Sequence, residues 1–394
     1  MKYCSKCLLP ESHETISFDA NGVCSVCLNI TQKGSIDWDS KRVELDEIVR
    51  KFQGKGDYDC IVPFSGGKDS VWTLYYTVKI LGLKPLVVSF DHGFYRPNLV
   101  KNREKVTKQL GVDVLIFTPN WRLVQKLMLQ SFLEKGDFCW HCHTGIFSYP
   151  MWIALEKKIP LILWGEPSSE YTSYYDYSET EHVDEDRFNR ITNLGMTAQD
   201  MQARLGDEFL ARDFKPFTYP SPKDLKELGV ISVPLGSFIP WDVKKQVGII
   251  SEELGWQGDQ VEGIPSQYPY EKIECYLQGV RDYIKYRKRG FARTTHLTSI
   301  DIRNNRMSRT EALKLVAEHE GKRPQSLDLF LSYVGLTEEE FDEVVESHKL
   351  AWVETPRTFQ LSTRLHDSDE WNKNPPMQRD QSLPTIEEWR EFNQ

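Results

Sequence analysis

The sequence lacks long apolar runs, although hydrophobic residues make up 40% of its 394 positions. A membrane-spanning helix needs about 18 or more consecutive apolar residues, so no membrane span is predicted. The first ten residues contain cysteine and lysine but no apolar segment of the kind found in secretion signals. We therefore expect a cytoplasmic protein without a lipid anchor, with room for two or three structural units.

The chain also lacks an excess of positive charge, because its formal net charge is -9. Nucleic-acid affinity rests largely on neutralised phosphates, so a nucleic acid is not the expected main ligand. A glutaminase signature is missing as well: residue 2 is Lys, and no nucleophile elbow surrounds a cysteine. If the protein consumes ammonia, a partner has to supply it.

Cysteine is sparse but patterned, since six of the eight cysteines form three Cys-x-x-Cys pairs. This spacing suits metal ligation in a reducing compartment better than a disulfide framework. Two pairs lie within the first forty residues, which contain almost no apolar material for a core. Four thiolates can complete a tetrahedral zinc shell and supply the folding free energy. We predict a closed, structural zinc module over residues 1–40, with the ligands Cys4, Cys7, Cys24 and Cys27.

From about Asp57, short apolar runs alternate with longer helical stretches, which is typical of parallel βαβ units. The fold predicted for 41–240 is an α/β, doubly wound parallel sheet with helices on both faces. A mostly helical substrate or partner region is expected over 241–394, where capping boxes begin at Ser308 and Thr337. The expected strands are 60–64, 86–90, 114–117, 161–164 and, less clearly marked, 231–235, with an amphipathic helix over 71–81.

A glycine-rich hexapeptide lies between the first expected strand and the helix that follows it. Its glycines let the backbone approach a phosphate, and the free N–H groups at the helix start favour an anion. Lys68 adds a full positive charge, and Asp69 can help to hold a magnesium ion. The predicted phosphate-binding loop consists of Ser65, Gly66, Gly67, Lys68, Asp69 and Ser70.

This loop has neither the Walker A spacing nor the GxGxxG spacing. SGGKDS after a strand resembles the PP-loop of the N-type ATP pyrophosphatases, which include GMP synthetase, NAD synthetase, asparagine synthetase and tRNA-thiolating enzymes. The resemblance implies ATP cleavage between the α and β phosphates, with pyrophosphate held by the loop and Lys68 and Asp69 in catalytic roles. It also implies that further residues lie near the ligands: Ser89, Asp91 and His92 at the end of the second strand, and Gly165 and Glu166 after the fourth.

The third pair, Cys139 and Cys142, lies well downstream of the loop in the segment CWHCH. Three interpretations stay open. The pair could form an iron–sulfur or other metal site with Cys275, as in the tRNA thiolases that this arrangement resembles. It could form a second zinc site with a histidine ligand, or it could be a reduced, buried pair.

Positive charge is concentrated between Arg281 and Arg309. One interpretation is an ordinary solvated helix face. The other is contact with the diphosphate and carboxylate of a small substrate, for which arginine is suited. On the second interpretation, Arg293 is a catalytic candidate, and Arg303 and Arg306 are substrate-binding candidates.

Most of the chain resembles the N-acetyl sugar amidotransferases of bacterial surface-polysaccharide and nonulosonic-acid biosynthesis, the WbpG-like proteins. The resemblance spans roughly residues 3 to 320 and rests on YCSKCLLP, GVCSVC, VPFSGGKDS, FDHGFYRPN, FCWHCHTGI, PLILWGEPSSEY, DYIKYRKRGFARTT and SIDIRNNRMSRTEAL.

It implies that ATP, with Mg²⁺, activates the acetamido group of a nucleotide sugar, and that ammonia converts this group to an acetamidino group. A separate glutaminase, similar to the amidotransferase pair of histidine biosynthesis, would supply the ammonia. The alternatives are a tRNA-thiolating enzyme and a zinc-bearing nucleotide-binding scaffold. We interpret 171–222 as an excursion near the active site and expect an irregular tail after Thr363.

Overall fold

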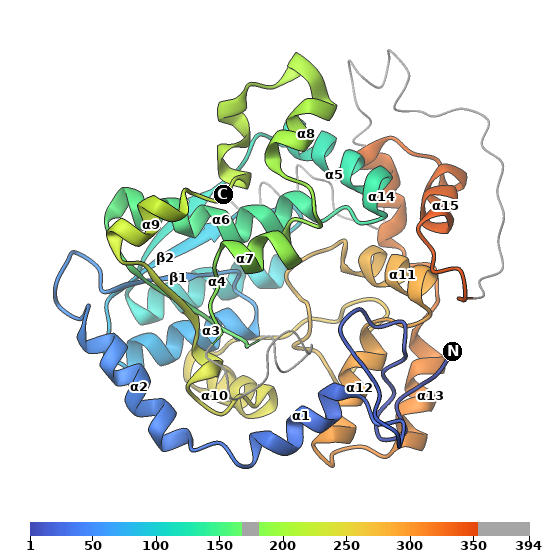
Figure 1. Ribbon diagram of the computed structural model, residues 1–394, viewed down its shortest axis with the longest axis horizontal. Coiled ribbons are helices and arrows are strands. Elements are labelled where there is room, and N and C mark those ends of the chain that lie inside the picture. Colours follow the sequence, from blue (N-terminus) through green and yellow to red (C-terminus); the bar gives the residue numbers. More distant parts are fainter. Residues whose placement is uncertain (168–180, 354–394) are drawn as a thin grey trace.

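The computed structural model describes residues 1–167 and 181–353 (Figure 1). The tyrosine-rich part of the predicted excursion, over 171–180, and the tail after Thr363 lie outside the described residues. In the described part, every helix is too short or too polar to cross a lipid bilayer.

The centre of the molecule is a five-stranded parallel sheet with the strand order β3-β2-β1-β4-β5. The predicted strands are confirmed with ends that differ by at most one residue. Their bounds are β1 Cys60–Pro63, β2 Pro85–Phe90, β3 Asp113–Phe117, β4 Leu161–Trp164 and β5 Ile231–Pro234.

Apolar residues follow one another in these strands because both faces of the sheet are covered. Val62 of β1 and Val87 of β2 belong to a cluster on one face, whereas Ile61 and Leu86 belong to a cluster on the other face. Edge strand β3 is the exception, since Ile116 is 54% exposed. Both faces of the sheet are therefore buried, except along the edge strand β3.

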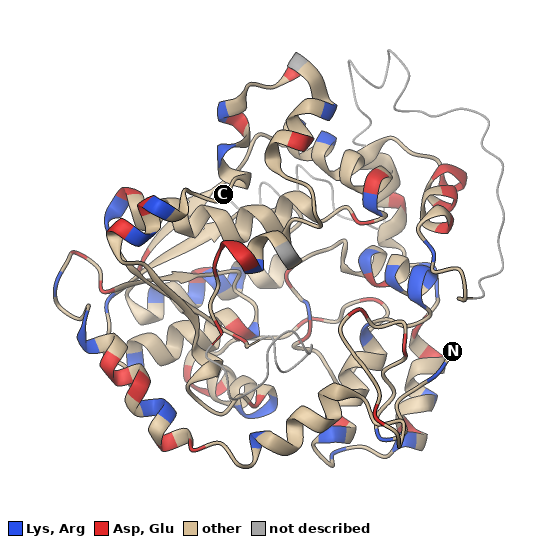
Figure 2. Ribbon diagram, in the orientation of Figure 1, with Lys and Arg blue, Asp and Glu red and all other residues tan. Residues whose placement is uncertain are grey.

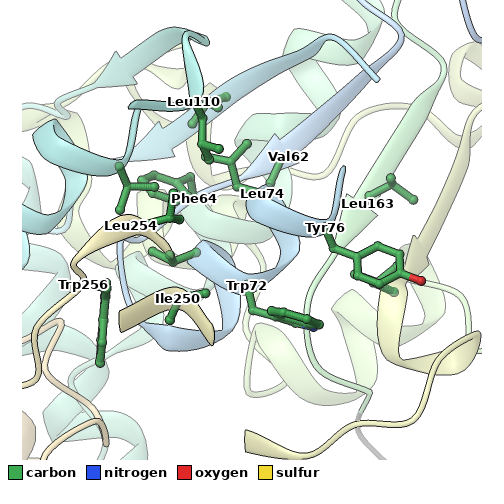
Figure 3. Close-up of a cluster of buried hydrophobic side chains, with 14 of the residues drawn as sticks. Val62, Phe64, Trp72, Leu74, Tyr76, Leu110, Leu163, Ile250, Leu254 and Trp256 are labelled. Atoms are coloured by element: carbon green, nitrogen blue, oxygen red, sulfur yellow. The ribbon is translucent and has the colours of Figure 1, made fainter. Parts of the chain in front are cut away.

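The first face of the sheet is covered by helices from both halves of the chain. Figure 3 shows Phe64 and Leu74 packed against Ile250 and Leu254. The predicted 71–81 helix is observed as a helix that continues into a π-helical segment, Tyr76–Ile80 (η1). The helices of this face are α2 Trp38–Arg50, α3 Lys68–Tyr75, α4 Pro97–Leu110 and α10 Val243–Leu254.

The second face is covered chiefly by α6 Trp140–Lys157, which packs on β1, β2 and β4. Helix α5, Trp121–Lys135, lies beside it and begins at Asn120, whose side chain accepts hydrogen bonds from the first-turn backbone. Shorter elements complete this layer: α7 Glu185–Arg187, η3 Phe188–Thr192, α8 Ala198–Leu205, η4 Gly206–Glu208, η5 Ala211–Phe217 and α9 Pro222–Leu228. The short η6, Leu235–Ser237, follows β5, and its Leu235 belongs to the cluster on the first face.

The C-terminal helices form a second hydrophobic cluster with α5 and lie at the right of Figure 1. Both predicted capping boxes are confirmed: Ser308 with Glu311 starts α13, and Thr337 with Glu340 starts α15. The helices of this region are α11 Gln278–Arg289, α12 Arg293–Arg303, α13 Arg309–His319, α14 Ser326–Val334 and α15 Glu338–Ser347.

The N-terminal segment ends in α1, Ser25–Lys33, and packs on these C-terminal helices rather than on the sheet. The backbone N–H of Leu8 donates to Ser299 of α12 (3.1 Å), and Arg309 of α13 donates to the carbonyl of Cys4 (2.8 Å). The ranges 1–40, 41–240 and 241–394 remain predictions. Helix α10, from the last range, lies within the core of the sheet.

Candidate functional site

The SGGKDS loop lies at the carboxyl end of β1, where the strand order reverses. Strands β2 and β3 lie on one side of β1 in the sheet, and β4 and β5 lie on the other side. Ligands of open parallel sheets bind in the crevice at this switch point. Helix α3 begins at Lys68, so its free backbone N–H groups face the same crevice.

Internal hydrogen bonds shape the loop. The hydroxyl oxygen of Ser70 accepts from the N–H of Gly66 (3.0 Å) and lies 3.2 Å from the hydroxyl of Ser65. The indole N–H of Trp256 donates to the Gly66 carbonyl (3.0 Å). Gly66 has φ +90°, which favours glycine, and a Cβ at Gly67 would lie 1.9 Å from a carboxylate oxygen of Glu274. The backbone geometry therefore favours glycine at position 66, whereas glycine at position 67 leaves room for the side chain of Glu274.

Lys68 is buried at the centre of the site, with its side chain only 4% exposed. Its Nζ lies 2.8 Å from the carboxylate of Asp69 and 3.0 Å from that of Glu271. Burial alone would lower the pKa of Lys68, but the charges of Asp69 and Glu271 outweigh it and raise this pKa well above its ordinary value. Lys68 is therefore charged at neutral pH.

Carboxylates crowd around this lysine. Glu166 follows β4, and burial together with the charge of Asp69 raises its pKa well above the usual range. One buried oxygen each of Asp69, Glu166 and Glu274 has no hydrogen-bond partner among the described residues. Carboxylate oxygens are ligands of Mg²⁺, which normally keeps waters and phosphate oxygens as its other ligands. In the described residues, however, only the four N-terminal cysteines place three or more ligand atoms within 4.8 Å of one another, so a magnesium site at these carboxylates stays a prediction.

Glu271 and Glu274 come from an irregular segment, residues 255–277, which we call the strap. Two contacts fix the strap to the segment that follows β2. Arg96 pairs with Asp259 (3.0 Å), and the N–H of Tyr276 donates to the carbonyl of Phe94 (2.8 Å). Neither glutamate can be predicted from the sequence, because the strap has no periodic pattern and its contacts are distant in sequence.

The polar residues at the end of β2 and directly after it differ in their hydrogen bonding. The hydroxyl of Ser89 donates to the carbonyl of Phe64 (2.5 Å), and Asp91 accepts from the N–H of Gly93 (2.8 Å) and from Thr118 (3.0 Å). His92 keeps Nε2 without a partner in the described structure, and burial lowers its pKa to about 3. Ser89 and Asp91 thus shape this edge of the crevice, while the substrate-binding role of His92 stays a prediction.

Gly165 marks a close approach between β4 and α3. A Cβ at this position would lie 2.9 Å from the hydroxyl of Thr73 and 3.3 Å from the carbonyl oxygen of Asp69. The glycine therefore lets the end of β4 approach the phosphate loop, which places the next residue, Glu166, in the crevice.

Cys139 and Cys142 occupy the start of α6, and the structure brings Cys275 of the strap near them. Burial raises the pKa of Cys139 well above its ordinary value and that of Cys275 to about 12. The neighbouring His141 is buried with both ring nitrogens unpartnered among the described residues. The three cysteines lie beside Glu274, and the choice between metal site and reduced thiols stays a prediction.

The N-terminal cysteines form a compact cluster. All four are buried, and their sulfur atoms lie within 4.8 Å of one another, with Cys4–Cys27 at 3.9 Å and Cys7–Cys24 at 3.7 Å. A tetrahedral zinc ion with Zn–S bonds of about 2.3 Å separates its sulfur ligands by about 3.8 Å. This cluster can therefore hold a metal ion such as zinc.

The three candidate arginines do not converge on one point. Arg293, at the start of α12, lies 3.6 Å from Glu271, which places it one carboxylate away from Lys68. Arg303 is buried near Cys7 of the N-terminal cluster. Arg306 pairs with Asp242 (2.8 Å). The substrate roles of Arg303 and Arg306 stay predictions.

Together, fold and loop define a parallel α/β protein with a glycine-rich loop at its switch point. Residues 262–366 match the family described as "LPS biosynthesis protein WbpG-like, C-terminal domain". The match confirms the WbpG-like resemblance for this C-terminal part of the chain and supports a role in polysaccharide biosynthesis. The matched region contributes Glu271, Glu274 and Arg293 to the site.

Part of the chain is also similar to a protein whose function is not described. A stretch of 120 residues is 30% identical to the uncharacterized protein MJ1599 of Methanocaldococcus jannaschii. The aligned stretch covers 30% of this chain and 43% of that relative. The chain thus matches less than half of the length of MJ1599, whose description names no activity.

Proposed function

We propose that this chain is an ATP-dependent amidotransferase of the PP-loop type. It converts the acetamido group of a nucleotide-linked N-acetyl sugar to an acetamidino group, in the biosynthesis of a bacterial surface polysaccharide or nonulosonic acid. One observation carries the proposal. The phosphate-binding loop at the switch point meets, through the Lys68–Glu271 contact of 3.0 Å, a domain of the WbpG-like family.

The chemistry follows from the poor leaving ability of an amide oxygen. In the first step, this oxygen attacks the α-phosphorus of ATP, and pyrophosphate leaves. In the second step, ammonia attacks the imidate carbon, AMP departs with the former amide oxygen, and the nitrogen loses a proton. The product is an acetamidino sugar.

The residues of the crevice suit the first step. Lys68 and the backbone N–H groups at the start of α3 face the place where negative charge develops on the pyrophosphate. A magnesium ion held by Asp69 and Glu166 would neutralise further phosphate charge. Arg293, next to Glu271, is in a position to bind the sugar substrate.

Ammonia is proposed to come from separate glutaminase subunits, because the sequence has no glutaminase signature. We expect the purified chain to use ammonium chloride but not glutamine. Efficient use of glutamine by the chain alone would contradict this part of the proposal.

The test is to incubate the protein with ATP, Mg²⁺, ammonium chloride and a UDP-linked N-acetyl sugar. We expect AMP and pyrophosphate to form together with a sugar whose mass reflects replacement of one oxygen by NH. The Lys68→Ala variant should lose both products. Lys79→Ala is the matched control, because Lys79 is exposed and follows the same helix. No AMP formation with any N-acetylated nucleotide sugar would refute the proposal.

A second candidate is a tRNA-thiolating activity, favoured by the approach of Cys275 to Cys139 and Cys142 beside the phosphate loop. Three thiolates there could bind an iron–sulfur cluster or a second zinc ion. Anaerobic reconstitution with iron and sulfide, followed by absorption spectroscopy and a tRNA thiolation assay, tests it. The absence of both a cluster spectrum and thiolated tRNA would exclude this candidate.

A further inference from the structure

A cationic cavity lies on the far side of Arg293 from the phosphate loop. Its volume is about 320 Å³, and it is enclosed by the end of α5, the turn before α6, one face of α11 and the N-terminal module. Six cationic side chains and three carboxylates line it, which gives a positive cavity in a chain whose net charge is -9. Figure 2 shows basic residues gathered along α11, which forms its wall. The cavity is therefore suited to an anion.

Several of these cations are not neutralised by close partners. The guanidinium of Arg281 makes no direct hydrogen bond or ion pair with a side chain in 1–167 or 181–353, although the carboxylates of Asp137 and Asp282 lie nearby. Arg293 has only long contacts, 3.6 Å to Glu271 and 3.7 Å to Asp282. The Nζ of Lys285 lies 2.9 Å from the ring of His296, a neutral partner at most pH values.

Other cations of the wall are already used to build it. Lys288 donates to the carbonyl oxygens of Lys135 (2.9 Å) and Gly136 (3.0 Å) at the end of α5, and Arg289 pairs with Glu14 (3.0 Å). These contacts fix the rim of the cavity. Of the four other cations, Lys135 lies at the end of α5, whereas Arg281, Lys285 and Arg293 lie on α11 and α12 and can turn to a ligand.

We propose that this cavity binds the diphosphate group of a nucleoside diphosphate ester, through Arg281, Lys285 and Arg293. Planar guanidinium groups recognise phosphate oxygens in pairs, and an ammonium group adds a compact charge. Glu271 contacts both Lys68 of the phosphate loop and Arg293 of the cavity, and it therefore separates the two places. A second phosphate ligand can bind in the cavity while the loop holds ATP. That the ester is a nucleotide sugar rests on the proposed function.

Binding measurements test the site without turnover. We expect isothermal titration calorimetry to show UDP binding to the wild-type protein, with uridine binding much more weakly. Arg281→Gln should weaken UDP binding by about tenfold or more, as expected for the loss of charge-assisted hydrogen bonds. Arg212→Gln is the matched control, because Arg212 is exposed and distant in sequence from the cavity. Circular dichroism should show that both variants keep the wild-type fold.

A second titration separates the two possible phosphate ligands. A non-hydrolysable ATP analogue should bind to Arg281→Gln as it binds to wild type and should lose affinity in Lys68→Ala, whereas UDP should lose much more affinity in Arg281→Gln than in Lys68→Ala. Unchanged UDP affinity in Arg281→Gln, or a loss confined to the ATP analogue, would overturn the assignment. If UDP binds as expected but no nucleotide sugar supports AMP formation, the proposed function fails and the diphosphate site stands.

Discussion

The ion pair between Lys68 and Glu271 is the contact whose removal should be most informative. Both side chains are almost fully buried, and their charged atoms are 3.0 Å apart. Removing one partner of a buried pair leaves an uncompensated charge and typically costs about 3 to 5 kcal/mol. We therefore expect Lys68→Met to lower the free energy of unfolding by about this amount, measured by urea denaturation with circular dichroism. Lys79→Met, at an exposed position, should change it little.

A double-mutant cycle separates this contact from a general loss of packing. In Lys68→Met/Glu271→Gln, the uncompensated carboxylate of Glu271 is also removed, so part of the lost stability should return. We expect a coupling free energy of about 0.5 to 3 kcal/mol. Pyrophosphate release should not return, because the lysine is still missing. Strict additivity of the two single effects would refute our account of the site.

The pH dependence gives a third readout. Burial alone would raise the pKa of Glu271, but the charges of Lys68, Lys272 and Arg293 lower it from 4.5 to about 2. A carboxylate whose pKa is lower in the folded state stabilises the fold above its unfolded pKa, and this contribution is lost as the pH falls through the folded pKa. The stability difference between wild type and Lys68→Met should therefore shrink between about pH 4.5 and pH 2. A constant difference over that range would argue against the pair.

Three further predictions concern the zinc module, the loop and the cationic cavity. Cys24→Ala should abolish bound zinc, measured by elemental analysis, and lower the melting temperature, because metal binding supplies folding free energy. Gly66→Ala should destabilise the fold by at least about 1 to 2 kcal/mol, because Gly66 has a positive φ and an added Cβ would lie 2.3 Å from the side chain of Arg103. Gly248 in α10 has no neighbour close to an added Cβ, so Gly248→Ala should stabilise the fold by about 1 kcal/mol. Equal effects of the two substitutions in thermal unfolding would contradict this prediction. Burial and the charges of Arg293 and Arg281 lower the pKa of Lys285 to about 8, although Glu14 and Asp282 oppose this shift. UDP affinity should therefore fall as the pH rises through about 8. Calorimetric titrations of Lys285→Gln, which keeps the facing His13 and His296, should show no such pH dependence.

Much of the sheet could be predicted because a parallel sheet covered on both faces needs unbroken apolar runs. Leu161–Trp164, which is buried throughout, was located to the residue. The phosphate loop could be placed as well, since the glycines and the following helix are local features. Glu166 could be expected near the ligand because β4 borders β1.

The other half of the site could not be predicted, because tertiary contacts create it. Glu271 lies more than two hundred residues from Lys68 in an irregular segment, and no local pattern marks the contact. The basic stretch was recognised, but three-dimensional packing decides which cations face a cavity. Arg281 lines the cationic cavity, whereas Arg303, chosen from the sequence, lies near the N-terminal cysteines.

Glu271 touches both Lys68 and Arg293, so a single carboxylate serves two neighbouring cations. A pyrophosphate group that takes Lys68 as its partner leaves this carboxylate to Arg293 alone, which reduces the positive charge that Arg293 offers to a second ligand. Binding at the loop and at the cationic cavity is then thermodynamically linked, and such linkage is reciprocal. In the proposed enzyme, this carboxylate makes the affinity for one substrate depend on whether the other is already bound.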